Sequence, residues 1–557
     1  MISLLKRNPL FICLLFGWFL LNLLQSIFTE INPDEAYYVL YGQHLSWGYY
    51  DHPPLVALIT RTGSLFFTGN LGARIVTVFL QIPTLIITWH LIDVNERGKR
   101  EILAFFIISA SLVMFAVYGF TTTPDVPLLF FTSLFLYAYK KILEKQDWLF
   151  ILIMGMSMAG LIYSKYQGVL VIGFVFLSNP KLIVTPKLWP GFILAFLLCI
   201  PHFYWQYING FPSIKYQLVD SASHFHWENI ADYLPNQVLV FNPFTLGAVI
   251  YLLFKYKAAN AFERANYFLV TGFISFFWIM TYHRHAEPHW TVAASIPMII
   301  LLNNKISLDS RLRQYTFRFI AGSLLLTLVA RIVIVTNMLP AGTDISGKKG
   351  YYLAVEKIAH NNPVVFSGSF QEPSLYTFFT GNPSSVVSSL NTRKTQFDLW
   401  NIQNEWKNKT VFVVSNKGTK VNSYKYANNI IQGFFTDDFQ STNSLIIKFK
   451  LQDNSIHSGD TVTVDFTIEN PANREINFLN ADLPVIIEAI LSNRERMVEI
   501  KGGMKNQMAV LAPKQKISNQ IKFVIPQGMI GEVKIAVCCS SCFGRTLNSD
   551  LKKIMIL

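Results

Sequence analysis

The sequence contains few charged residues for its length. Of its 557 residues, 15% are Asp, Glu, Lys or Arg, while 52% are hydrophobic and 15% are aromatic. A soluble globular protein carries about 25% charged residues, so this composition argues against an ordinary water-soluble enzyme and against a disordered chain. The membrane-protein class is therefore the first to be tested.

Cysteine is also scarce, and five residues are too few for a disulfide framework. Cys538, Cys539 and Cys542 cluster near the C-terminal end. In an oxidising compartment Cys542 could pair with either of the other two, and three free thiols are the alternative. Three thiols within five residues, with no second ligand group nearby, do not indicate a zinc site.

Long apolar runs are abundant from Pro9 to about Leu339. A run of about 20 residues crosses a hydrocarbon core of about 30 Å. The runs predict eleven spans, at about 9–29, 74–93, 102–120, 125–139, 148–163, 166–178, 189–208, 237–254, 266–283, 290–303 and 316–339. The first run is too long for a removed signal peptide and lacks a small-residue cleavage site, so we expect it to be an anchor.

Lysine and arginine distinguish the two sides of these spans. If the runs cross the membrane in turn, every loop on the same side as the N-terminus is basic. The loops on the opposite side contain only Arg61, Arg74, Lys165, Lys215 and Arg284. Positive residues are retained in the cytoplasm, which predicts a cytoplasmic N-terminus and an external segment after Leu339. Much of the net charge of +13 then reflects topology and gives no support to nucleic-acid binding.

The segment after the last span changes in composition and predicts two further domains. Short β-rich runs alternate with helical composition up to about Lys450, which is typical of an α/β unit. Runs such as 461–468 and 532–538 are then separated by Gly, Pro and Asn, the pattern of a small β-sandwich. We expect domains at 1–340, 341–450 and 451–557.

The first external loop contains the most ionisable groups. Asn32 and Pro33 can begin a helix in which Asp34 and Glu35 favour the positive end of the dipole, and this accounts for both acids without catalysis. It does not account for the second cluster, Asp51-His52, before Pro53-Pro54. A carboxylate near a histidine at the membrane surface is also typical of a general base.

Three further external positions carry ionisable groups with two interpretations each. Asp125 could cap a helix or belong to a site. Lys165 and Arg74 could extend towards the interface or contact a lipid phosphate.

The turn from Tyr282 to Trp290 contains three histidines with Arg284 and Glu287. It could bind an anionic group, bind a divalent metal, or be a polar turn without a ligand. Its candidate site residues are His285 and Glu287. The long external loop at about 209–236, with Asp220, His224 and His226, could be a lid or a connector.

Together these segments resemble the bacterial branch of the protein O-mannosyltransferase superfamily, including the lipid A aminoarabinose transferases. The resemblance rests on Asp34-Glu35 before Tyr37-Tyr38, Gly48 to Pro54, Arg74, Thr123-Pro124-Asp125, Ser164-Lys165-Tyr166, Trp205 to Pro212, His285 to Trp290 and Arg393 to Trp400. It covers about residues 1–400. It implies a polytopic α-helical membrane protein of the GT-C type, with a C-terminal α/β and β-sandwich region outside the bacterial inner membrane.

The resemblance also implies an activity and roles for the residues. The activity is transfer of a sugar from a polyprenyl-phosphate donor to a lipid, glycan or protein acceptor. The catalytic residues would be Asp34, as the base, and Glu35 beside it. The residues that bind donor phosphate or substrate would be drawn from Asp51, His52, Arg74, Asp125, Lys165, His285 and Glu287. His52 stands where the lipid A transferase has a lysine, and no cofactor is certain, with a divalent metal left open.

Two other functions fit a chain with many spans. A transporter or flippase of a lipid-linked substrate would have ionisable groups within its spans and broken helices. Arg331 is the charge that lies well inside a predicted span. A membrane anchor that displays the β-rich segment would not need its polar external loops.

Overall fold

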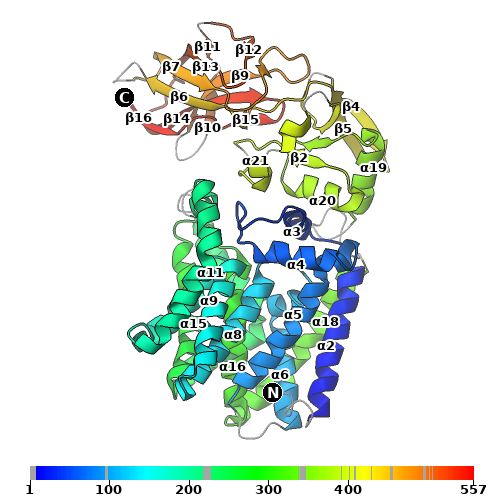
Figure 1. Cartoon of the computed structure of the whole chain (residues 1–557), viewed down its shortest axis with the longest axis vertical. Coiled ribbons are helices and arrows are strands. Elements are labelled where there is room, and N and C mark those ends of the chain that lie inside the picture. The colour runs from blue at the N-terminus through cyan, green and yellow to red at the C-terminus, as the bar shows by residue number, and fades with distance from the viewer. Residues whose placement is uncertain are drawn as a thin grey trace. The chain divides into compact units, whose positions relative to one another are not determined.

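The computed structural model describes residues 8–93, 98–217, 227–336, 338, 347–390, 392–400, 402–406, 409–418, 420–427, 429–451, 456–492, 497–500, 502–504 and 506–557. The chain divides into two compact units, Met1–Gly347 and Lys348–Leu557. Figure 1 shows that the first unit is helical and that strands occur in the second. Each unit is described by itself.

The helical unit contains a helix in each of the eleven predicted spans. Its α-helices are α2 (Pro9–Phe28), α3 (Pro33–Gln43), α4 (Leu55–Ser64), α5 (Gly69–Leu91), α6 (Lys99–Ser111), α7 (Val113–Val117), α8 (Asp125–Glu144), α9 (Trp148–Ser164), α10 (Gly168–Ser178), α11 (Trp189–Ile208), α12 (Pro212–Lys215), α13 (Trp227–Phe241), α14 (Pro243–Lys255), α15 (Ala261–Met280), α16 (Ser295–Ile306), α17 (Ser310–Tyr315) and α18 (Ala321–Val335). A 3-10 helix, η4 (Pro288–Ala294), precedes α16, and a π-helical turn, η5 (Thr316–Ile320), joins α17 to α18.

Within the described residues, five helices are long and apolar enough to cross a membrane, or six if one bent pair is a single span. The helices α9 and α10 are apolar but shorter. The helices α3 and α4 lie between α2 and α5, in the first of the loops predicted to be external.

The predicted span at 237–254 is not one straight helix. The helices α13 and α14 meet at an angle of 101°. Asn242, between them, has a φ of +66°, and its side chain accepts a hydrogen bond from the backbone N–H of Phe244 at 3.0 Å. Pro243 removes a backbone donor and starts the new helix, so the sequence Asn-Pro explains the break.

Small residues allow close approach between the spans. A Cβ atom on Gly155 of α9 would lie 2.4 Å from the backbone oxygen of Gly191 in α11. Close backbone contact of this kind is a usual way for helices to associate in a bilayer, where the hydrophobic effect does not drive them together.

The second unit begins with a five-stranded sheet in the order β2-β1-β3-β5-β4. Its strands are β1 (Val364–Phe366), β2 (Ser384–Val386), β3 (Val411–Val414), β4 (Asn422–Tyr426) and β5 (Asn429–Thr436). The strands β1, β2 and β3 are parallel, and the helices α19 (Lys349–Ala359) and α20 (Gln371–Thr380) accompany them. This is the predicted α/β part.

Two antiparallel sheets form the predicted sandwich. One has the order β11-β13-β7-β6 and the other the order β10-β9-β14-β15, with β16 also paired to β14. Their strands are β6 (Ile446–Leu451), β7 (Thr461–Glu469), β9 (Ile486–Ser492), β10 (Met497–Ile500), β11 (Gly503–Met504), β13 (Lys516–Val524), β14 (Gly531–Ser541), β15 (Gly544–Thr546) and β16 (Lys552–Ile556). A short pair, β8 (Ile476–Asn477) and β12 (Val510–Leu511), accompanies them.

The strand at 446–451 belongs to the sandwich, where it pairs with β7, and not to the α/β part in which the sequence analysis placed it. The alternating pattern of β6 buries Ile447 and Phe449 in the sandwich core, which explains the difference. The two parts also share a core cluster that joins Val365 and Val413 to Phe543. All five cysteines are free, so the disulfide alternative is not formed.

Candidate active site

The first external helix starts as the sequence predicts. The side chain of Asn32 accepts a hydrogen bond from the backbone N–H of Asp34 at 2.9 Å. The carboxylate of Glu35 accepts one from the backbone N–H of Asn32 at 3.1 Å, which completes a capping box. The capping interpretation of the two acids is therefore confirmed as the local structure of α3.

Glu35 has a second set of partners that the sequence analysis did not foresee. Its Oε1 accepts hydrogen bonds from Nε of Arg74 and from the backbone N–H of Thr122, both at 2.8 Å. Its Oε2 lies 2.5 Å from a terminal nitrogen of Arg74, and both side chains are 1% exposed. Glu35 thus joins α3 to α5 and to Thr122 in the turn before α8.

Arg74 is saturated in this arrangement. Besides Glu35, its guanidinium donates to the backbone oxygens of Ser26, Thr29 and Glu30, at distances from 2.7 to 3.2 Å. An arginine has five N–H donors, and these contacts use all five. Arg74 therefore has no donor left for a phosphate, contrary to its place among the predicted phosphate contacts, because it folds inward from the second turn of α5.

Asp51 is buried beneath the aromatic residues of the first loop. Tyr41 of α3 donates a short hydrogen bond to its carboxylate. The ring of Tyr41 stacks on Tyr49 with a centroid distance of 4.0 Å. Burial and the charge of Asp51 raise the pKa of Tyr41 well above its ordinary value, so the phenol remains a donor.

A second buried ion pair joins the turns before α8 and after α9. The ammonium of Lys165 lies 2.8 Å from each carboxylate oxygen of Asp125. Both residues are almost fully buried. Of the two interpretations given to Lys165, extension towards the interface is wrong.

The turns predicted to be external bring these groups together. Tyr118 lies within electrostatic range of Asp34 and Tyr38 as well as Asp125. The hydroxyl of Tyr38 lies 3.2 Å from Nε2 of His52. We define the outer cluster as Asp34, Tyr38, Asp51, His52, Tyr118, Asp125, Lys165 and His289.

His289 is the histidine of the turn from Tyr282 to Trp290 that reaches the outer cluster. It lies at the start of η4 and interacts electrostatically with Lys165 and His52. Burial, and then these two basic groups, lower the pKa of His289 well below its ordinary value, so it is neutral at pH 7. A neutral imidazole can both donate and accept a proton.

His285 and Glu287, the predicted site residues of that turn, are exposed. In the described part of the chain, no hydrogen bond or ion pair joins either side chain to the outer cluster. Arg284 of the same turn donates to the backbone oxygen of Gln217 at 2.6 Å and stacks on Trp290. Residues 218–226, which include Asp220, His224 and His226, lie outside the described residues.

Polar groups of α11 support the first loop from another side. His202 makes a 2.7 Å contact through Nδ1 with the backbone oxygen of Trp47. A Cβ atom on Gly48 would lie 2.4 Å from the ring of Trp205, so this glycine permits the loop to pack on α11. Gln206 donates to Tyr166 at 2.8 Å.

Tyr41, which donates to Asp51, and Tyr118, which lies within electrostatic range of Asp125, were not among the residues predicted from the sequence, and His285 was predicted where the structure brings His289 to the outer cluster. The tyrosines follow or precede the external turns, where aromatic residues are also common as membrane anchors, so their identity alone gives no signal. The position of His289 after Pro288, at the start of a helix, was a usable signal.

The charge balance of the outer cluster is acidic. It contains three carboxylates, Asp34, Asp51 and Asp125, and one lysine, while Glu35 is neutralised by Arg74 outside it. Among the described residues, no group of three or more His, Cys, Asp or Glu is arranged to hold a metal ion. The cluster offers carboxylates for proton transfer, two imidazoles and one ammonium.

Comparison with known proteins finds a family model and a relative that each match part of the chain. Residues 51–205 match the family model described as dolichyl-phosphate-mannose-protein mannosyltransferase. A protein of Aquifex aeolicus, described only as uncharacterized, is 30% identical over 164 residues, which are 28% of this chain and 33% of the relative. The match therefore spans about a third of the relative's length.

Two solved structures cover most of the chain. They are ArnT from Cupriavidus metallidurans in the apo state and the same protein bound to undecaprenyl phosphate. Each aligns with a TM-score of 0.54 at 13% identity and covers 77% of this chain and 98% of ArnT. The predicted fold, a polytopic helical membrane protein of the GT-C type with a C-terminal extramembrane region, is confirmed, as is the resemblance.

Proposed function

We propose that this chain, which has the GT-C fold of membrane glycosyltransferases, transfers a sugar from a polyprenyl-phosphate donor to a lipid, glycan or protein acceptor. The match to the mannosyltransferase family model supports the proposal because residues 51–205 contain most of the outer cluster. The ArnT structure with undecaprenyl phosphate supports the class of donor, since that protein shares the fold.

The contrast between Asp34 and Glu35 is the observation that carries the proposal. The two carboxylates are neighbours in sequence and have opposite surroundings. Glu35 is completely buried and is held by Arg74 and two backbone N–H groups. Asp34 is only half-buried, at the first turn of α3, within electrostatic range of Tyr118.

These surroundings suit different roles. A general base must reach the proton that it takes, and a half-buried carboxylate can do so. A carboxylate that already accepts four hydrogen bonds and pairs with an arginine is a poor base, because protonation would break the pair. We therefore assign the base to Asp34 and a positioning role to Glu35, in place of the catalytic role that the resemblance gave it.

The reaction needs one base and no general acid on the leaving group. Asp34 takes the proton of an acceptor hydroxyl or amine as that atom forms a bond to the anomeric carbon. The bond from the anomeric carbon to the phosphate oxygen breaks, and its electron pair remains on the phosphate. A phosphate is a stable leaving group at pH 7, so an inverting displacement with a single carboxylate is sufficient.

The negative charge that develops on the phosphate requires donors nearby. With Arg74 saturated, the basic members of the outer cluster are Lys165, His52 and His289. Two of the three ammonium protons of Lys165 are directed to Asp125, which leaves one for a ligand. Asp51 and Tyr41 would hold the loop that carries His52.

A polyprenyl donor cannot leave the bilayer, which explains why the outer cluster lies among the loops of a membrane protein. The distribution of lysine and arginine supports a cytoplasmic N-terminus, an external site and an external C-terminal unit. In a bacterium this corresponds to the inner membrane and the periplasm.

The test is transfer by the Asp34→Asn variant of the purified full-length protein in detergent. The probe is radiolabelled sugar on undecaprenyl phosphate, with an envelope extract as the source of acceptor. We expect a loss of transfer of at least a hundredfold, typical of a removed general base. The control is Asp232→Asn, which removes an exposed acid of α13 outside the outer cluster.

The transition temperature of Asp34→Asn should stay within a degree or two of the parent, since the cap of α3 is made by Asn32 and Glu35. Full transfer by a folded Asp34→Asn variant would overturn the assignment of the base. Loss of transfer in Asp232→Asn as well would show that the assay reports damage and not catalysis.

One observation favours a transporter or flippase of a lipid-linked substrate as a second candidate. The break between α13 and α14 borders an apolar cavity of about 320 Å³ that is also lined by Arg331. Broken helices and buried charges occur in transporters. Movement of a fluorescent polyprenyl phosphate across proteoliposomes, unchanged in Asp34→Asn, would support this candidate over the transferase.

A further inference from the structure

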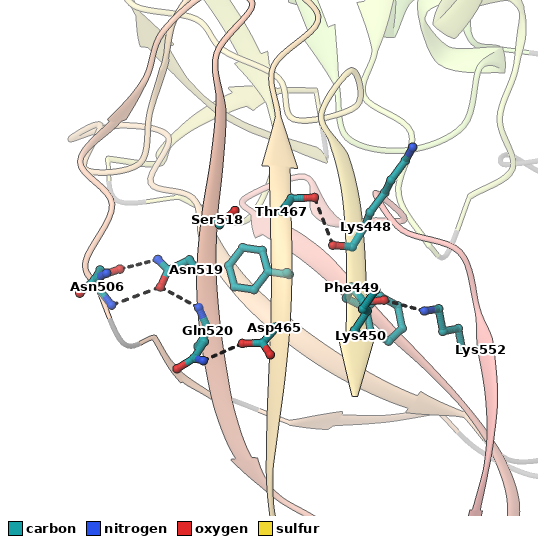
Figure 2. Close-up of a pocket in the computed structure, with 11 residues that line it drawn as sticks. Lys448, Phe449, Lys450, Asp465, Thr467, Asn506, Ser518, Asn519, Gln520 and Lys552 are labelled. Atoms are coloured by element: carbon teal, nitrogen blue, oxygen red, sulfur yellow. Dashed lines mark hydrogen bonds between the residues drawn. The ribbon is translucent and has the colours of Figure 1, made fainter. Parts of the chain in front are cut away.

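The outer face of the sandwich is hollowed over three adjacent strands, β6, β7 and β13 (Figure 2). The hollow has a volume of about 510 Å³, within the range of about 300–1,000 Å³ that is typical of ligand sites. It is lined by Lys448, Phe449, Lys450, Asp465, Phe466, Thr467, Asn506, Ser518, Asn519, Gln520 and Lys552. The proposed function does not use any of these residues.

Strand pairing places the polar side chains in two rows. Lys450 is opposite Asp465, which is opposite Gln520, and these form the first row. Lys448, Thr467 and Ser518 form the second row in the same way. Strands are about 4.8 Å apart and alternate residues about 7 Å apart, so the two rows present six polar groups over an area of about 10 by 7 Å.

Two groups from outside these strands border the hollow. The backbone of Asn506 exchanges hydrogen bonds with the side chain of Asn519, at 2.7 and 3.3 Å. Lys552 of β16 donates to the backbone oxygen of Phe449 at 2.5 Å and lies over its ring (Figure 2). An ordinary solvated sheet face needs no such border.

The charges of the hollow select an anion. Three lysines and one aspartate line it, which gives a net charge of three minus one, or +2. Lys448 and Lys450 are exposed, so their ammonium groups can turn towards a ligand, while the ammonium of Lys552 is held at the border by Phe449 and adds its charge from there. Lysine binds carboxylate and phosphate oxygens as a flexible point charge.

The remaining polar groups select a ligand with hydroxyl groups. Oδ1 of Asp465 accepts a hydrogen bond from Nε2 of Gln520 at 2.6 Å, which fixes the middle and one end of the first row (Figure 2). The negative charge of Asp465, next to Lys450 in the first row, repels a ligand that offers only negative charge, and its carboxylate accepts hydrogen bonds from hydroxyls. Gln520, Ser518 and Thr467 can donate to hydroxyls and accept from them.

We propose that this hollow binds an acidic oligosaccharide, with the lysines holding its acid groups and the row of Asp465 and Gln520 holding its hydroxyls. The binding site belongs to the second unit and does not depend on the proposed transferase activity.

The lysines also have a structural explanation that the test must separate. The strand β6 is at the edge of its sheet, and lysines on an edge strand oppose the addition of a further strand. If this were their only role, their removal would cause aggregation without changing the affinity for a saccharide.

The experiment measures binding by calorimetry to the full-length protein in detergent at low salt. The acidic probes are the hexamers of galacturonate and mannuronate. Maltohexaose is the neutral saccharide, and hexaglutamate is the acidic probe without sugar hydroxyls. We expect at least one hexauronate to bind tenfold or more tightly than both of the other probes.

The variant Lys448→Gln with Lys450→Gln should weaken hexauronate binding at least tenfold, and Asp465→Asn should reduce the preference for hexauronate over hexaglutamate. The matched control is Lys553→Gln, which removes an exposed lysine that pairs with Glu532 outside the hollow. Its affinity should remain within twofold of the parent, and size exclusion should show that all variants are equally monodisperse.

Several results would overturn the proposal. Equal binding of maltohexaose removes the requirement for acid, and equal binding of hexaglutamate indicates an acidic peptide as the ligand. Affinity unchanged in the double lysine variant places any binding elsewhere, and lack of binding by both hexauronates rejects the site. None of these results depends on whether the protein transfers sugar.

Discussion

Arg74 and Glu35, 39 residues apart in the sequence, form a buried ion pair in which the guanidinium also binds three backbone oxygens. The pair fastens the first external loop to α5, and Thr122 adds the second external turn to it. Asp34, the proposed base, is adjacent to this joint. The position of the base therefore depends on a residue that does not itself react.

This relationship predicts a large loss of stability when one partner is removed. Glu35→Gln or Arg74→Met should each destabilise the helical unit by about 3–5 kcal/mol. The first change leaves the buried charge of Arg74 uncompensated, and the second leaves the buried charge of Glu35 uncompensated. Arg74→Lys should recover little of the stability lost in Arg74→Met, because lysine cannot supply the paired geometry. Thermal unfolding in detergent measures these effects.

The double variant Glu35→Gln with Arg74→Met separates the pair from its individual charges. It should be more stable than the sum of the single changes predicts, because no buried charge is left alone. Transfer by the double variant should remain low if Glu35 positions Asp34. Recovery of stability together with full transfer would contradict the positioning role.

The burial of His289 predicts that the stability of the protein depends on pH. The pKa of His289 is lowered in the folded protein, so the unfolded state binds the proton more readily. Stability should thus be complete above about pH 6.5, the ordinary pKa of histidine, and should fall as the pH decreases below it.

His289→Gln should remove part of that fall. The measurement is the transition temperature of parent and variant at pH 8 and pH 5.5, with the exposed His283 changed to Gln as the control. The variant should lose less stability than the parent on acidification. An identical fall in both would show that His289 does not titrate as its burial indicates.

The proposed orientation predicts which loops a membrane-impermeant maleimide can reach. Lys420→Cys, at an exposed lysine of the second unit, should react in cells whose outer membrane is permeable. Lys187→Cys, at an exposed position in a basic loop between α10 and α11, should react only after the inner membrane is opened. The parent protein, with its five cysteines, gives the background.

The reverse pattern, with Lys187→Cys labelled first, would place the second unit in the cytoplasm. It would also move the outer cluster away from the compartment in which we place it. Either pattern leaves the fold unchanged, so this measurement tests the orientation alone.

Local information was sufficient for much of the fold. The apolar runs located a helix in every predicted span, because the requirement for about 20 apolar residues acts on each segment by itself. The capping box at Asn32 and Glu35 was also predictable, since its groups are three residues apart. The runs at 461–468 and 532–538 correspond to β7 and β14, because the pattern of a strand is also contained in its own segment.

What the sequence did not determine was the pairing of polar groups from distant segments. The partners Glu35 and Arg74, and Asp125 and Lys165, are 39 and 40 residues apart, and each has several other charged groups nearer in sequence. Ion pairing is decided by which groups are buried together, and a list of external residues cannot reveal this. The choice of His289 over His285 followed from the turn before η4.

The sequence by itself thus determined which segments suit lipid and which suit water, because hydropathy and charge act residue by residue. It also identified the external loops as the place of the ionisable groups. Only the tertiary structure decided that Arg74 is saturated by Glu35 and the backbone while Asp34 remains half-buried. The reason is physical: burial fixes which groups the guanidinium of Arg74 reaches, and donors that are already used are not available to a phosphate.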